Sequence, residues 1–130
     1  MNELLRGCCV AVLGFLAALS PGPLIAATFL TPEEAFKVEA KQTKPGFVEV
    51  RLTVAKGYAL YRARTQVSAV GDDAKIAKVN SPDTADEHYR GLTILTVEMS
   101  GMTTALLVKV QGCADAGLCY PPVERRLELR

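Results

Sequence analysis

The chain has 130 residues, a length that suits one domain and is too short for two. Its 15 lysine and arginine residues nearly balance its 14 aspartate and glutamate residues, and no basic run stands out. This balance argues against nucleic acid and against an anionic membrane surface as partners.

Residues 1–27 are predicted to form a secretory signal peptide. Arg6 supplies a positive charge, residues 8–19 are almost wholly apolar, and the sequence Ser-Pro-Gly-Pro at residues 20–23 would end any helix. The apolar core has about a dozen residues, whereas a membrane-spanning helix needs ~20. An uncleaved membrane anchor is the alternative, because two more apolar residues follow. We expect export and a mature domain of residues 28–130.

One short helix is predicted at the start of the mature chain. Thr31 would be its N-cap, Pro32 its first residue, and Glu34 would occupy the capping-box position. A strand at residues 36–40 is expected to follow directly.

Alternating apolar residues predict β-strands in the rest of the chain. In residues 46–54 the side chains of Val48, Val50, Leu52 and Val54 share one face. Further strands are predicted at residues 58–70, 92–99, 104–111 and 123–130, with the two middle ones joined by a turn at Ser100 and Gly101. Short strands separated by turn residues indicate an all-β fold, an immunoglobulin-like antiparallel β-sandwich.

Two cysteines remain after the signal peptide, Cys113 and Cys119, and an even count in an exported chain points to one disulfide. They lie six positions apart, and the small residues between them would let the loop fold back. Closing a loop of seven residues stabilises a fold by about 2.4 kcal/mol, against roughly 4.3 for a loop of sixty. The pair is therefore either a modest structural disulfide or a reversible exchange pair, since a short-range pair at a loop is accessible to a partner's cysteine.

Two other interpretations involve His88, the only histidine of the chain. With Asp115 and the two thiolates it could hold zinc, although structural zinc prefers four ligands at tighter spacings. A Cys–His couple could also serve a hydrolase. His88 lies in a polar segment where a surface role is expected, so we predict no metal and no organic cofactor.

The cysteine segment resembles the active-site segment of the N-terminal domains of the DsbD family of thiol:disulfide interchange proteins. The resemblance is carried by residues 111–122, Gln-Gly-Cys-Ala-Asp-Ala-Gly-Leu-Cys-Tyr-Pro-Pro. Residues 56–62, Lys-Gly-Tyr-Ala-Leu-Tyr-Arg, resemble a second segment of these domains, and residues 75–79 resemble a third more weakly. The similarity runs from about Phe29 to Leu129.

This resemblance implies an immunoglobulin-like sandwich with the cysteine pair on a hairpin at its edge. It also implies a protein-disulfide reductase relay in the periplasm. Electrons would arrive from a membrane-embedded thiol reductase and pass to periplasmic thioredoxin-like proteins, which isomerise disulfides or serve cytochrome c maturation. Cys119 would attack the partner's disulfide, and Cys113 would resolve the mixed disulfide.

Several other residues are implicated by the same resemblance. Tyr58 and Tyr61 match family tyrosines near the active site. The family also has a cap loop over the disulfide, made of an acidic pair followed by an aromatic residue. Asp86 and Glu87 followed by His88 could be this loop, with the histidine in place of the aromatic residue. The same segment could equally be the start of the next strand. The residues expected to shield or modulate the cysteine pair are Tyr58, Tyr61, Asp86, Glu87, His88, Asp115 and Tyr120.

In the family, membrane helices and a thioredoxin-like domain follow this domain, whereas the present chain ends at Arg130. We therefore expect a separate membrane protein to reduce it, and we expect a monomer. The alternative hypothesis is a non-catalytic immunoglobulin-like binding module with a structural disulfide. The redox potential separates the two, because structural disulfides typically lie below about −300 mV.

Overall fold

The computed structural model describes residue 22, residues 28–83 and residues 86–129. The predicted signal peptide, including Cys8 and Cys9, therefore lies outside the described residues, apart from Gly22. None of the helices in the described part is long and apolar enough to cross a membrane.

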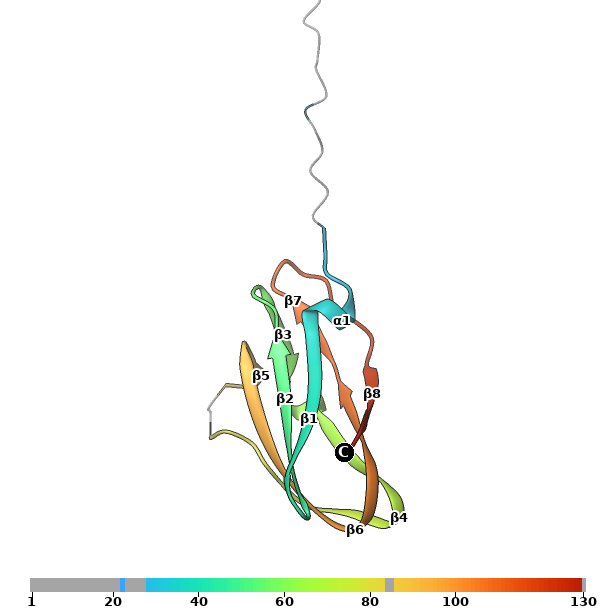
Figure 1. Cartoon of the computed structure of the whole chain (residues 1–130). Coiled ribbons are helices and arrows are strands. Elements are labelled where there is room, and N and C mark those ends of the chain that lie inside the picture. Colours follow the sequence, from blue (N-terminus) through green and yellow to red (C-terminus); the bar gives the residue numbers. More distant parts are fainter. Residues whose placement is uncertain (1–21, 23–27, 84–85, 130) are drawn as a thin grey trace, which may run out of the picture.

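Antiparallel strands form two sheets (Figure 1). The larger sheet has the order β1-β2-β6-β4, with β8 also paired to β6; its strands are β1 (Phe36–Lys44), β2 (Phe47–Val54), β4 (Gln66–Asn80), β6 (Leu92–Val110) and β8 (Val123–Glu128). The smaller sheet has the order β5-β3-β7, formed by β3 (Tyr58–Tyr61), β5 (His88–Tyr89) and β7 (Gly112–Ala114). The predicted immunoglobulin-like antiparallel β-sandwich is confirmed.

The hydrophobic core lies between the sheets and follows the alternation seen in the sequence. Val48, Val50 and Leu52 of β2 are fully buried, while Arg51 between them is exposed. Leu60 of the smaller sheet belongs to the same buried cluster, together with residues of β6. The period-2 pattern in residues 46–54 thus marks a strand with one face in the core.

The short helix α1 (Pro32–Ala35) begins as predicted. The Thr31 hydroxyl accepts a hydrogen bond from the Glu34 backbone N–H at 3.3 Å, and the Glu34 carboxylate accepts one from the Thr31 backbone N–H at 3.0 Å. This reciprocal pair is a capping box. The strand expected at residues 36–40 is longer, because β1 pairs with β2 as far as Lys44.

The turn predicted at Ser100 and Gly101 is wrong, because both residues lie inside the continuous 19-residue strand β6. Gly101 has a φ of +78°, and a Cβ atom there would lie 2.1 Å from the carbonyl oxygen of Asp73 on β4. Register shifts mark this part of the β4–β6 pairing. The glycine therefore permits a bulge and a close approach between two strands. In the sequence, a glycine in a bulge looks the same as a glycine in a turn.

The single strand predicted at residues 58–70 is also wrong. After β3, residues Arg62–Arg64 form a turn of 3-10 helix, and the chain then enters β4 in the other sheet. The Thr65 hydroxyl donates a hydrogen bond to the Tyr61 carbonyl at 3.0 Å and supports this change of direction. Both sides of the turn are rich in strand-forming residues, so composition alone hides the break.

Candidate functional site

Cys113 and Cys119 face each other across a tight hairpin formed by residues 112–120, which we call the cysteine hairpin. The Ala114 N–H donates to the Leu118 carbonyl at 2.7 Å, and the Tyr120 N–H donates to the Gly112 carbonyl at 3.0 Å. These bonds flank the cysteines and make them a non-hydrogen-bonded antiparallel pair, the position at which Cα atoms approach most closely. Their Cα atoms are 4.0 Å apart, and a disulfide joins the sulfurs.

The two cysteines differ in exposure. Cys119 is exposed, whereas Cys113 is half-buried. Cys113 belongs to β7 and pairs with Ala59 of β3, while Cys119 lies on the other arm of the hairpin, outside β7. Gly117, with a φ of +108°, allows the tight return between them. A thiol of another protein therefore reaches Cys119 more readily than Cys113.

Tyr61 contacts the disulfide. In the pairing of β3 with β7, Ala59 lies opposite Cys113, and Tyr61 follows two residues later on the same face of β3. The Tyr61 hydroxyl lies 3.4 Å from Cys113 Sγ. A disulfide sulfur carries no hydrogen, so the tyrosine hydroxyl is the donor.

The segment from Asp86 to Tyr89 lies beside Tyr61. His88 pairs with Tyr61 across β5 and β3, and their ring centroids are 5.0 Å apart. The His88 N–H donates to an Asp86 carboxylate oxygen at 3.0 Å. This segment is both a neighbour of Tyr61 and the start of the next strands, since β5 is formed by its last two residues and β6 begins at Leu92.

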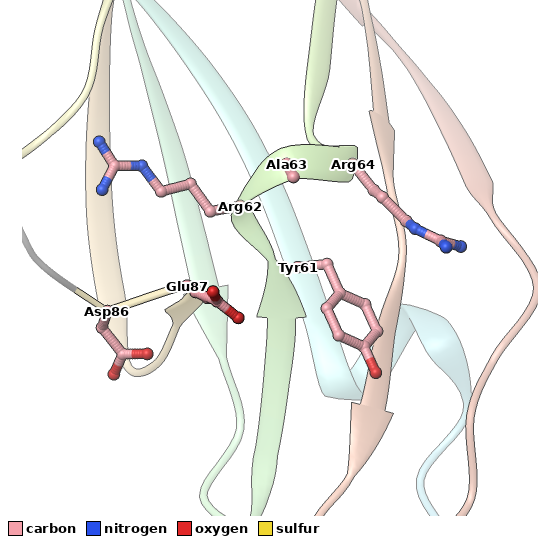
Figure 2. A pocket seen from close by; sticks show the side chains of 6 residues that line it. All are labelled: Tyr61, Arg62, Ala63, Arg64, Asp86 and Glu87. Atoms are coloured by element: carbon pink, nitrogen blue, oxygen red, sulfur yellow. The ribbon is translucent and has the colours of Figure 1, made fainter.

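A pocket of about 400 Å³ opens next to Tyr61; its lining residues are Tyr61, Arg62, Ala63, Arg64, Asp86 and Glu87. Figure 2 shows Arg62 and Arg64 pointing to opposite sides of the 3-10 turn. Both carboxylates lie on the Arg62 side, and the Tyr61 ring lies on the Arg64 side. Arg64 donates a hydrogen bond to the Gln111 side chain at 2.7 Å, next to the cysteine hairpin. The surface beside the disulfide thus carries charges of both signs.

Tyr58 and Tyr120, two further candidates, belong to the core. The Tyr58 hydroxyl accepts a hydrogen bond from the Leu30 N–H at 2.8 Å, and the Tyr120 hydroxyl donates to the Leu30 carbonyl. The ring of Phe36 packs edge-on against both, with centroids 6.1 Å and 5.5 Å away. Burial raises the pKa of the Tyr120 phenol. Tyr58 therefore lies in an aromatic cluster on the core side, unlike Tyr61.

Asp115, in the turn of the cysteine hairpin, forms an ion pair with Arg90. An Arg90 guanidinium nitrogen lies 3.0 Å and 3.1 Å from the two carboxylate oxygens. The Asp115 backbone N–H donates to the Gly57 carbonyl at 2.8 Å. Asp115 thus fixes the turn of the hairpin to two neighbouring loops.

Zinc binding by the cysteines with His88 and Asp115 finds no support in the geometry. The His88 ring lies against the Tyr61 ring at a tilt of 48°, whereas Asp115 pairs with Arg90. Among residues 22, 28–83 and 86–129, no group of three or more histidine, cysteine, aspartate or glutamate side chains could hold a metal ion.

Two residues that shape the site were not predicted. Gly112 precedes Cys113, and a Cβ atom there would lie 2.3 Å from the Ala59 carbonyl oxygen. A glycine next to a strand is a signal for such a close approach, so this position could have been found. Arg90 gave no such signal, because its partner Asp115 is 25 residues away.

Comparisons with known proteins agree with this geometry. The family model described as "Thiol:disulfide interchange protein DsbD, N-terminal" matches residues 26–130. The thiol:disulfide interchange protein DsbD of Ralstonia nicotianae is 35% identical, over 88% of this chain and 21% of that protein. The chain spans about a fifth of the length of these curated relatives.

Two solved structures from Neisseria meningitidis are similar as well. The reduced DsbD N-terminal domain has a TM-score of 0.56 and 26% identity, over 77% of this chain and 88% of the other. A chain in the complex between the N-terminal domains of DsbD and PilB has a TM-score of 0.57 and 25% identity, over 79% of the present chain and 88% of the matched one.

Proposed function

The chain belongs to the family of DsbD N-terminal domains, and on this basis we propose that it relays electrons by thiol–disulfide exchange at Cys113 and Cys119. The observation that carries the proposal is the unequal placement of the two sulfurs. The residue Cys119 is exposed at the hairpin, whereas Cys113 is half-buried and its sulfur contacts the Tyr61 hydroxyl. An exchange pair needs this difference, because one thiol must react with a partner while the other remains shielded until it resolves the mixed disulfide.

The domain is reduced in two steps. A thiolate of the donor attacks the exposed Cys119 Sγ, the intramolecular S–S bond breaks, and Cys113 leaves as a thiolate. A second donor thiolate then attacks the donor's own sulfur in the mixed disulfide and releases Cys119 as a thiolate. The donor is thereby oxidised to a disulfide, and the domain gains two electrons.

The domain reduces its acceptor by the reverse sequence. The Cys119 thiolate attacks the acceptor's disulfide, and one acceptor sulfur leaves as a thiolate. Cys113 then attacks Cys119 Sγ, re-forms the intramolecular disulfide and releases the acceptor as a dithiol after protonation. The Tyr61 hydroxyl, 3.4 Å from Cys113 Sγ, would stabilise the Cys113 thiolate in both directions, because hydrogen bonds to ionised groups are the stronger ones.

The donor in this proposal is a membrane-embedded thiol reductase, and the acceptors are thioredoxin-like proteins of the periplasm that serve disulfide isomerisation or cytochrome c maturation. The solved DsbD–PilB complex supports a protein partner, because a similar domain binds a second protein there. The proposed location is the periplasm, reached through the predicted signal peptide.

We assign shielding to the segment that contains Asp86, Glu87 and His88. His88 lies against the ring of Tyr61, which in turn contacts Cys113. The histidine ring would thus protect the disulfide side of β3 from small oxidants. The acidic pair lines the adjacent pocket and would influence which partner surface fits there.

A trapping experiment tests this function. Cys113→Ser should accumulate a mixed disulfide with a periplasmic thioredoxin-like protein, seen as a band that a reductant abolishes, because nothing resolves the complex. Cys119→Ser should trap much less. Stronger trapping by Cys119→Ser would exchange the roles of the two cysteines. Absence of any trapped partner with both variants would favour the binding module with a structural disulfide.

A further inference from the structure

We propose that Arg90 is a positioning residue that holds the cysteine hairpin closed while its disulfide is open. The inference rests on the proposed exchange function and concerns the same pair of sulfurs. It assigns a task to the Arg90–Asp115 ion pair, which the exchange chemistry itself does not require. This ion pair is the clamp of the cysteine hairpin.

The clamp joins three parts of the chain at the cysteine end of the sandwich. Arg90 follows β5, and its guanidinium contacts both oxygens of Asp115 at 3.0 Å and 3.1 Å. The same nitrogen lies 3.4 Å from the carbonyl oxygen of Tyr58 on β3. Because one cation contacts a strand end and the hairpin turn together, it fixes the turn relative to the sheet.

The backbone on either side supports the clamp. The Gly91 carbonyl accepts a hydrogen bond from the Val54 N–H at 2.8 Å, which anchors the residue after Arg90 to the end of β2. On the other side, the Asp115 N–H donates to the Gly57 carbonyl at 2.8 Å. The backbone is therefore anchored at Asp115 and at the residue after Arg90, and the two side chains complete the link.

Asp115 lies in the turn between the two cysteines, so its position affects how they face each other. While the disulfide is closed, the S–S bond itself holds the hairpin. When the domain is reduced, or when Cys119 is bound to a partner, the contacts of Asp115 remain, together with the hairpin hydrogen bonds, the pairing of β7 with β3 and the packing of Tyr120. The clamp then keeps Cys113 near Cys119 Sγ and raises the effective concentration of the resolving thiolate.

The expected effect follows from the exposure of the clamp. The side chains of Arg90 and Asp115 are 50% and 54% exposed, and pairs of this kind contribute about 0.2–1 kcal/mol, which corresponds to about 1.4- to 5-fold in an equilibrium constant. Removing the clamp should weaken disulfide closure about threefold. At 29.6 mV per tenfold change for a two-electron couple, this raises the redox potential by about 14 mV.

The experiment measures the equilibrium between the domain and a glutathione buffer for the unmodified protein, Arg90→Ala, Asp115→Asn and the double variant. Each single variant should shift the equilibrium about threefold toward the dithiol, and the double variant should add little, because both changes remove the same contact. High salt should remove the difference, since the pair is exposed. Arg90→Lys should show a smaller shift, because lysine keeps the charge without the planar donor group.

Arg126→Ala is the matched control. Arg126 pairs with Glu128 at 2.6 Å on β8, and these side chains are 54% and 58% exposed, much like those of the clamp. This variant should leave the glutathione equilibrium unchanged. The clamp would be overturned by an Arg90→Ala variant that remains folded and has the same glutathione equilibrium as the unmodified protein and Arg126→Ala.

The glutathione measurement separates the clamp from the relay. A shifted equilibrium without any trapped protein partner would support the clamp and contradict the relay. A trapped partner together with an unshifted equilibrium would support the relay and contradict the clamp. In the relay itself, Arg90→Ala should lengthen the lifetime of the mixed disulfide about threefold.

Discussion

Gly112→Ala should destabilise the domain and disturb the cysteine pair together. Gly112 lies at the start of β7, directly before Cys113. A Cβ atom at this position would lie 2.3 Å from the Ala59 carbonyl oxygen and 2.6 Å from the nearest atom of the Phe36 ring. The ring could move, but the carbonyl belongs to β3, the strand that pairs with β7. The added methyl group must therefore push the two strands apart.

Such overpacking lowers the free energy of unfolding by about 1–3 kcal/mol. Because a backbone carbonyl cannot move aside as a side chain can, we expect a loss of about 2–3 kcal/mol here. For a domain of about this size, each kcal/mol lowers Tm by roughly 4–8 °C, so Gly112→Ala should lower Tm by roughly 8–24 °C. Displacement of β7 should also move Cys113 away from Tyr61.

Thermal unfolding followed by circular dichroism measures this loss, with Gly57→Ala as the control. Gly57 has a φ of +85° but no atom within 4 Å of an added Cβ, so its substitution costs only backbone strain of about 1–2 kcal/mol. Adding Phe36→Leu to Gly112→Ala should not restore Tm, because the Ala59 carbonyl remains in place. An unchanged Tm for Gly112→Ala, or full recovery in that double variant, would refute the steric argument.

Three further outcomes are expected. Replacing Cys113 and Cys119 together by serine should leave a folded β-sandwich by circular dichroism that has lost about 2.4 kcal/mol or less in urea unfolding, because main-chain bonds also hold the hairpin; an unfolded double variant would show that the disulfide is structural. Tyr61→Phe should slow alkylation of the Cys113 thiol at neutral pH in a Cys119→Ser background, because the thiolate loses a hydrogen-bond donor; an unchanged alkylation rate would contradict that role. Hydrogen bonds from the backbone and then the side chain of Thr31 hold the pKa of Glu34 below its usual value, so its stabilising contribution is present at neutral pH and is lost as the pH falls through the lowered pKa. Glu34→Gln should therefore lower the urea midpoint at neutral pH and match the unmodified protein in strong acid, whereas a constant difference would contradict the linkage.

Local patterns in the sequence predicted the parts of the fold that local physics decides. The capping box at Thr31 and Glu34 needs only four consecutive residues, and the buried face of β2 needs only the alternation of Val48, Val50 and Leu52. The strand break after Tyr61 was missed because it depends on a change of sheet. Contacts with a distant strand decide such features, and they leave little trace in neighbouring residues.

The candidate site divides in the same way. The spacing of Cys113 and Cys119 and the small residues between them predicted a loop that can fold back, and the family resemblance pointed to a hairpin and to Tyr61. Spacing could not distinguish the core side from the disulfide side of β3, so Tyr58 and Tyr61 were grouped together. The pairing register separates them, because it places Tyr61 on the face of Cys113. The Arg90–Asp115 pair could not be predicted, since it depends on how two loops meet.

The long strand β6 also affects how the chain reaches its fold. One part of β6 pairs with β2, a later part pairs with β8, and β4 pairs along most of its length. Until β6 is in place, β2 and β4 present unpaired edges, which are templates for association with other chains. Folding should be comparatively slow, because these pairings join residues far apart in sequence, such as Val50 with Leu95. A newly made chain would thus depend on the single strand β6 to close its larger sheet before its cysteines meet a partner.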